Sequence, residues 1–204
     1  MKFNANDLPA LLVAVSFAAG LNVYATLLSL GVLARLGTVS LPPGLQVLDQ
    51  WYVLSICGVM FVVEFFGDKI PIFDLIWSAL HTFVRVPVAA LLAFQATSGL
   101  SPEKQLVAAL LGGAIALAAH GGKTAVRAAV TPSPEPFSNI ALSMGEDALS
   151  VFLTWFATRH PYIAASIVGV LLVFIVATAG WVFRALRNLL RGAKAALIGP
   201  SPPR

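Results

Sequence analysis

Residues 64–87 read EFFGDKIPIFDLIWSALHTFVRVP, and the rest of the chain is organised around them. Six ionisable side chains lie here in a hydrophobic run that otherwise suits lipid: Glu64, Asp68, Lys69, Asp74, His81 and Arg85. In a helix after Pro71, steps of four, three and four residues place four polar residues on one face: Asp74, Ser78, His81 and Arg85. Ionisable groups at membrane depth cost roughly 2.5–3.5 kcal/mol each, so they normally face a protein interior, a partner or water. The stretch therefore predicts a buried polar stripe with a functional role.

The composition is typical of a multi-pass membrane protein. Of the 204 residues, 58% are hydrophobic and only 11% are charged, and the mean hydropathy is +0.87. Soluble domains carry about 25% charged residues, so we expect no separate soluble domain. The formal charge of +4 comes from Lys and Arg that cluster at expected helix ends and at the C-terminus, which argues against a nucleic-acid partner. Cys57 is the only cysteine, which excludes an internal disulfide.

Long apolar stretches predict an all-α, polytopic membrane helix bundle of about six transmembrane segments. The expected spans cover residues 8–36, 51–66, 72–95, 106–119, 140–157 and 162–183. The first span is longer than a bilayer of about 30 Å requires, and Gly20 and Asn22 in its middle indicate tilt or a local break. We therefore interpret residues 1–183 as one transmembrane domain with an uncleaved first span. Residues 184–204 are predicted to be a basic amphipathic cytoplasmic tail that binds anionic lipids.

Two parts of the chain suggest an internal repeat. A shift of 54 residues superposes Gly58 on Gly112, Gly67 on Gly121 and Lys69 on Lys123, although few other positions match. Residues 51–96 and 105–157 would each contain a short apolar helix, a Gly-x-Lys turn, a proline and a helix with a charged face. Paired apolar segments interrupted by Gly or Pro indicate broken or re-entrant helices around a transporter-type site. The sequence leaves open whether the two units run parallel or inverted.

The second of these units carries its own polar faces. His120, Thr124 and Arg127 follow at steps of four and three residues and are expected to share a helix face. The proline-rich residues 131–139 are predicted to be extended and rigid. A second polar stripe is expected on the fifth span, formed by Ser143, Asp147, Ser150 and Thr154. The site is therefore predicted to be shared between the two units.

The distribution of Lys and Arg predicts the orientation. With six spans, nine of them fall on the side of the C-terminus and three on the other side, which leaves Arg85 within the membrane. The positive-inside rule then predicts that both termini are cytoplasmic.

Three runs resemble one known family: residues 20–37 (GLNVYATLLSLGVLARLG), 64–87 and 120–147 (HGGKTAVRAAVTPSPEPFSNIALSMGED). They are similar to the bacterial membrane proteins grouped as domain of unknown function 4126, and the pieces DKIP and SPEPFSN are specific. The resemblance implies an integral protein of the bacterial inner (plasma) membrane and supplies no activity. Ser78 stands where members tend to have Asp, which argues against a mechanism that needs a carboxylate there.

The near-membrane polar residues form the candidate site for a ligand or an ion pathway. They are Glu64, Asp68, Lys69, Asp74, His81, Arg85, His120, Lys123, Arg127, Glu135, Asn139, Glu146 and Asp147. Fixing helix register needs only one or two ion pairs, so we favour a polar cavity on the cytoplasmic side over a purely structural network. Its bases suit a phosphate or carboxylate, whereas its acids and histidines suit a proton or divalent cation. His81 and His120 lack metal-ligand spacing, so we expect no metal and no cofactor.

Three classes of function fit these residues. The first is a small transporter or channel with a charged cavity for an ion or small anionic solute. The second is a membrane-embedded enzyme that acts on a lipid headgroup, and the third is a structural or assembly protein. The chain contains no HExxH, GxSxG or phosphatase signature, which disfavours the enzyme. Self-association into a homo-oligomer stays open.

Overall fold

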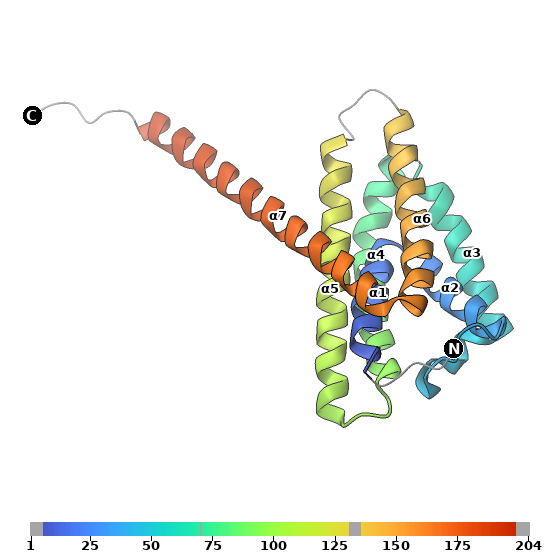
Figure 1. Ribbon diagram of the computed structural model, residues 1–204. Helices are drawn as coiled ribbons and strands as arrows, with labels where there is room; N and C mark the ends of the chain where they lie inside the picture. The colour runs from blue at the N-terminus through green and yellow to red at the C-terminus, as the bar shows by residue number, and fades with distance from the viewer. Residues whose placement is uncertain (1–5, 70, 131–135, 199–204) are drawn as a thin grey trace, which may run out of the picture.

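The computed structural model describes residues 6–69, 71–130 and 136–198, which form helices joined by short connections (Figure 1). Its elements are α1 (Leu8–Leu21), α2 (Val23–Arg35), the 3-10 helix η1 (Pro43–Asp49), α3 (Trp51–Gly67), α4 (Pro71–Ala96), α5 (Pro102–Val130), α6 (Pro136–Arg159) and α7 (Pro161–Ile198). No strand forms within the three described ranges. The predicted all-α fold is therefore confirmed.

The first apolar stretch is broken at Asn22. This residue has an extended backbone, with φ −147° and ψ 106°, and separates α1 from α2. Its side-chain oxygen accepts a hydrogen bond of 2.9 Å from the backbone N–H of Ala25, which caps α2. The local break predicted around Gly20 and Asn22 is thus present.

The chain reverses direction at this break. α1 runs parallel to α5, because Leu8 lines a pocket with Lys104 and Gly20 lies against Ala116. α2 runs antiparallel to α3, because the Arg35 guanidinium at its end lies 3.8 Å above the ring of Trp51 at the start of α3.

Because α4 is antiparallel to both α3 and α5, those two helices run the same way (Figure 1). The start of α1 and the end of α2 therefore lie at the same end of the bundle. We name it the hairpin end, as distinct from the tip of the hairpin at Asn22. We name the opposite end, where α3 and α5 finish, the charged end. A single crossing by residues 8–36 was the wrong prediction, because the capped extended residue Asn22 turns the chain back.

Small residues allow α1 to lie at the centre of the bundle, in contact with α4, α5, α6 and α7. Ala14 and Ala18 of α1 are fully buried, as are Ala116 and Ala119 of α5. A Cβ added at Gly112 of α5 would lie 3.0 Å from the hydroxyl of Ser16. Close approach through small residues is the usual way in which helices pack inside membranes.

Two predicted local features differ in the structure. The Gly-x-Lys turn expected at residues 121–123 lies inside the continuous helix α5. Gly122 leaves room there for the side chain of Ile175 on α7, whose Cδ1 would lie 2.8 Å from an added Cβ. The extended segment predicted for residues 131–139 lies outside the described residues up to 135, and from Pro136 the chain is helical. Proline suits the first turn of a helix because it lacks the N–H that would be unpaired there.

α7 begins at the hairpin end, where the hydroxyl of Tyr162 donates a hydrogen bond of 3.0 Å to the carbonyl of Asn6. It then runs toward the charged end and leans away from the other helices in its second half (Figure 1). Residues 184–198 of the predicted basic tail continue this helix without a break. The Arg, Leu and Ala residues of this part favour a helix, which explains the continuity.

Three described helices are long and apolar enough to cross a membrane: Pro102–Arg127, Ile140–Arg159 and Pro161–Trp181. η1 and α3 add a fourth span if this pair, bent by 68°, is counted as one. Three further apolar helices are shorter: Leu8–Leu21, Val23–Arg35 and Leu80–Ala96. The chain is therefore a helical membrane protein with three or four candidate spans by length and composition, and the predicted count of about six is not confirmed.

Replacing Gly20 by Ala should lower the free energy of unfolding by about 1–3 kcal/mol through overpacking. The added Cβ would lie 2.4 Å from the carbonyl oxygen of Ala116 and 2.8 Å from the Cβ of Ala119. Gly58→Ala is the matched control, because a Cβ there meets nothing within 4 Å. Thermal unfolding in detergent, followed by circular dichroism, measures the difference. Equal melting temperatures for the two variants would contradict the close approach of α1 and α5.

Candidate functional site

The tip of the α1–α2 hairpin meets charged side chains from α5 and α6. The amide nitrogen of Asn22 donates a hydrogen bond of 2.8 Å to the Oδ1 of Asp147 on α6. The Nζ of Lys123 on α5 donates to the carbonyl of Leu21 at 3.2 Å. The carboxylate therefore lies near the positive N-terminal end of α2, and the ammonium group lies at the negative C-terminal end of α1.

A group of ion pairs continues from Lys123 toward the charged end. The Oδ2 of Asp68, the residue that follows α3, lies 3.2 Å from the Lys123 Nζ and 3.0 Å from the Arg127 Nη2. The Oε2 of Glu146 on α6 contacts the same two bases, at 3.1 Å from Lys123 and 2.5 Å from Arg127. These four side chains join α3, α5 and α6.

A further buried pair joins α3 to α4. The Arg85 Nη2 donates to the Oε1 of Glu64, and both side chains are 0% exposed. The Nη1 of Arg85 lies 2.8 Å from the Nδ1 of His120, whose Nε2 lies 2.8 Å from the Thr82 hydroxyl. We name the six paired charges the ion-pair network: Glu64, Asp68, Arg85, Lys123, Arg127 and Glu146.

Asp147 is a fourth carboxylate beside the three acids and three bases of the ion-pair network. It is 5% exposed, and its hydrogen-bond donor is the neutral side chain of Asn22. Within the described part of the chain, its Oδ2 has no hydrogen-bond partner, and neither have the Oε2 of Glu64 and the Oδ1 of Asp68. Burying an ionised carboxylate without a paired base is costly.

Both polar stripes are buried where side chains are described. His81 and Arg85 are 4% and 0% exposed on α4, and Ser143, Asp147, Ser150 and Thr154 are all buried on α6. The α6 stripe faces α1, since the hydroxyl of Ser150 donates to the carbonyl of Ala18 at 3.3 Å. The face expected on α5 is only partly right, because Thr124 is exposed and Lys123 is buried instead. The buried face follows steps of three and four residues, through His120, Lys123 and Arg127, in place of the predicted steps of four and three.

The structure brings eight of the predicted site residues together: Glu64, Asp68, Arg85, His120, Lys123, Arg127, Glu146 and Asp147. His81 lies beside this group, with its Nε2 at 3.3 Å from the hydroxyl of Tyr24. Lys69 is directed elsewhere and donates to the carbonyl of Phe65 at 2.6 Å. Asp74, Glu135 and Asn139 lie outside the residues whose side chains the structure describes.

Sequence reasoning did not place Asn22 or the carbonyl of Leu21 in the site. Asn22 was expected to mark tilt or a local break, but a polar residue in an apolar run does not identify its partner. Tyr24 and Thr82 were likewise missed, because hydroxyl groups are common in membrane helices and carry no motif. The predicted helix break around Gly20 and Asn22 was the one signal in the sequence that pointed to Leu21 and Asn22.

A metal centre finds no support in the described side chains. Among them, no group of three or more His, Cys, Asp or Glu residues lies close enough to hold a metal ion. His81 and His120 contact Tyr24, Thr82 and Arg85, which fits hydrogen-bonded histidines of a helix interior.

Fold and site together define a helical membrane protein in which a hairpin of two half-helices meets a buried ion-pair network. The chain belongs to the family described as Domain of unknown function (DUF4126), whose sequence model matches residues 10–180. The resemblance found in the sequence is thereby confirmed. Comparisons with curated proteins and with solved structures gave no match.

Breaking the buried pair should be costly. Arg85→Gln is expected to lower the free energy of unfolding by about 3–5 kcal/mol, because it leaves the Glu64 carboxylate buried without its cation. The double variant Glu64→Gln/Arg85→Gln should be less destabilised than the sum of the single variants. Chemical unfolding in detergent of the wild type, both single variants and the double variant completes the cycle. Additive losses would contradict a direct coupling between the two charges.

Proposed function

We propose that the protein is a small transporter or channel whose cation-binding site lies at the tip of the α1–α2 hairpin. One observation carries this proposal: Asp147 accepts its hydrogen bond from Asn22 and is, among the described residues, the buried carboxylate without a paired base. Ionisable groups of this kind inside membrane proteins normally serve a substrate or ion pathway. Broken helices that end at membrane depth are a recurrent way to build such a site.

The pairing of the bases favours a cation over an anion. Arg85, Lys123 and Arg127 each already contact a carboxylate of the ion-pair network. An anion would have to separate one of these pairs, and a buried acid would then lose its partner. A cation that reaches the Oδ2 of Asp147 breaks no pair. A proton satisfies the same requirement.

Transport also needs a second arrangement of the site. Lys123 contacts Asp68, Glu146 and the carbonyl of Leu21, so it has more than one partner for its ammonium group. The described arrangement is closed, because Lys123 and Asp147 are both buried. We propose that an exchange of partners by Lys123 opens the tip of the hairpin to one side of the membrane.

The membrane topology that we propose contains five crossings, by α3, α4, α5, α6 and α7, and a re-entrant α1–α2 hairpin. Chain order then assigns eight Lys and Arg to the charged end and four to the hairpin end, with Arg85 between them. The positive-inside rule assigns the charged end and the C-terminus to the cytoplasm. The N-terminus would lie on the opposite side of the inner membrane, in place of the cytoplasmic position expected from six spans. Anionic lipids would bind the basic part of α7.

A flux measurement tests the proposed function. Purified protein in liposomes should move protons or monovalent cations faster than empty liposomes do, with phosphate as the anionic comparison. Asp147→Asn should reduce this flux by about tenfold or more, because it removes the charge at the site. Ser166→Ala is the matched control, since that exposed hydroxyl donates only within α7.

Two results would contradict the proposal. Wild-type flux equal to that of empty liposomes for every solute would exclude transport in any form. An unchanged flux in the Asp147→Asn variant would contradict the assignment of the cation site to Asp147. Conversion of a lipid headgroup during the same incubation would favour the enzyme alternative instead.

A further inference from the structure

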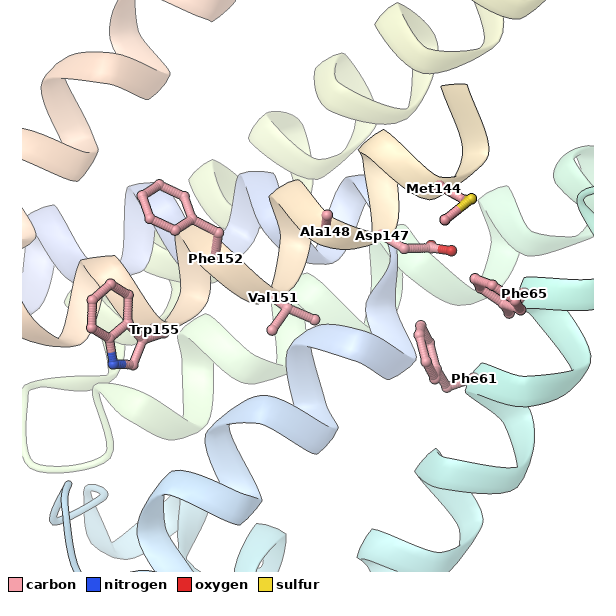
Figure 2. Close-up of a pocket in the computed structure, with 8 residues that line it drawn as sticks. All are labelled: Phe61, Phe65, Met144, Asp147, Ala148, Val151, Phe152 and Trp155. Atoms are coloured by element: carbon pink, nitrogen blue, oxygen red, sulfur yellow. The ribbon is translucent and has the colours of Figure 1, made fainter. Parts of the chain in front are cut away.

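A groove between α3 and α6 ends at Asp147. It has a volume of about 530 Å³, within the range of about 300–1,000 Å³ that ligand pockets usually occupy. Phe61 and Phe65 line its α3 side, and Phe152 and Trp155 line its α6 side (Figure 2). Asp147 is the charged residue of this lining, which is otherwise apolar. We name this feature the α3–α6 groove.

The carboxylate gives the α3–α6 groove a polar anchor. Asp147 is 5% exposed, and only its Oδ1 is held, by the amide of Asn22 at 2.8 Å. The Oδ2 is buried and lacks a hydrogen-bond partner among the described residues. Figure 2 shows this carboxyl group between Met144 and the two phenylalanines of α3. A ligand that lies in the groove contacts Asp147, and a small shift of this side chain would present the unpartnered oxygen to it.

The aromatic walls suit an organic cation. The faces of Phe and Trp rings attract cations, and this attraction grows when water is excluded. One ring of the groove already binds a cation of this chain, because the Lys69 Nζ lies 3.1 Å from the ring centroid of Phe65. Phe152 and Trp155 form a second aromatic pair, with ring centroids 6.0 Å apart.

The groove opens on the outer surface of the helices. Met144, Phe152 and Trp155 are exposed on α6, a helix apolar enough to span the membrane. A ligand would therefore arrive from the lipid phase, which requires it to be amphiphilic. An acyl chain or a neutral lipophile fits the apolar walls, but it leaves the charge of Asp147 unbalanced.

We propose that the α3–α6 groove binds an amphiphilic organic monocation, whose charged centre pairs with Asp147 and whose apolar groups pack on Phe61, Phe152 and Trp155. This inference rests on the proposed function and deepens it, because it names the class of cation that reaches the hairpin tip. The ligand enters sideways from the membrane and meets Asp147 on the side opposite to Asn22. Direct binding tests the inference independently of transport.

The probe is radiolabelled tetraphenylphosphonium, and tetraphenylborate is the anion of matching shape. Equilibrium binding to the purified full-length protein in detergent should be saturable for the phosphonium, and tetraphenylborate should not compete. Asp147→Asn should weaken the affinity by about thirtyfold or more, because the ligand then loses its buried counter-charge. Trp155→Leu should weaken it by about threefold to tenfold. Trp181→Leu is the matched control, since that exposed tryptophan is not part of the groove lining.

Ala148→Trp provides a second test if Asp147→Asn does not fold, because it fills the groove and leaves the carboxylate in place. Loss of phosphonium binding in this variant, with an unchanged melting temperature, supports the inference. Absence of saturable binding to the wild type overturns it, as does equal competition by tetraphenylborate or unchanged affinity in Asp147→Asn. Cation flux without phosphonium binding overturns this inference and leaves the proposed function standing. Phosphonium binding without flux of any solute supports the binding site in the α3–α6 groove and contradicts the proposed transport function.

Discussion

The hydrogen bond between Asn22 and Asp147 is the contact on which the centre of the molecule depends. A helix that ends inside a membrane leaves backbone N–H and C=O groups without partners, and lipid supplies none. Asn22 resolves part of this problem with one side chain, because its oxygen caps α2 and its nitrogen binds Asp147. Lys123 resolves another part at the carbonyl of Leu21. The hairpin and the charged helices therefore stabilise each other.

The ion-pair network and Asp147 have different physical explanations. Six charges that pair among themselves, five of them buried and Glu146 half-buried, can fix the register of α3, α4, α5 and α6 without any ligand. Asp147 takes no part in such pairing, because its Oδ1 binds Asn22 and its Oδ2 has no hydrogen-bond partner among the described residues. The hydrogen bond to Asn22 explains one oxygen of this carboxylate structurally, and the proposed cation site rests on the other oxygen. This distinction separates the structural interpretation of the charges from the functional one.

The sequence predicts the helices and their polar faces well because these features follow local periodicity. The buried stripe on α6 and the buried pair of His81 and Arg85 both follow from residue spacing. The reversal at Asn22 does not, since a Gly and an Asn in an apolar run indicate a break but not the direction of the next helix. Gly122 was misread for a similar reason, because a glycine serves a turn and a close helix contact equally well. Its contact with Ile175 belongs to α7, which lies far away in sequence.

The central position of α1 has a consequence for how the protein is made. α1 precedes α4, α5, α6 and α7 in the chain, yet these later helices provide its surroundings. Helices that emerge from the ribosome enter the membrane in chain order, so α1 has no packing partners when it arrives. The contacts that hold α1 in its central position can therefore form only after the later helices have been added to the chain.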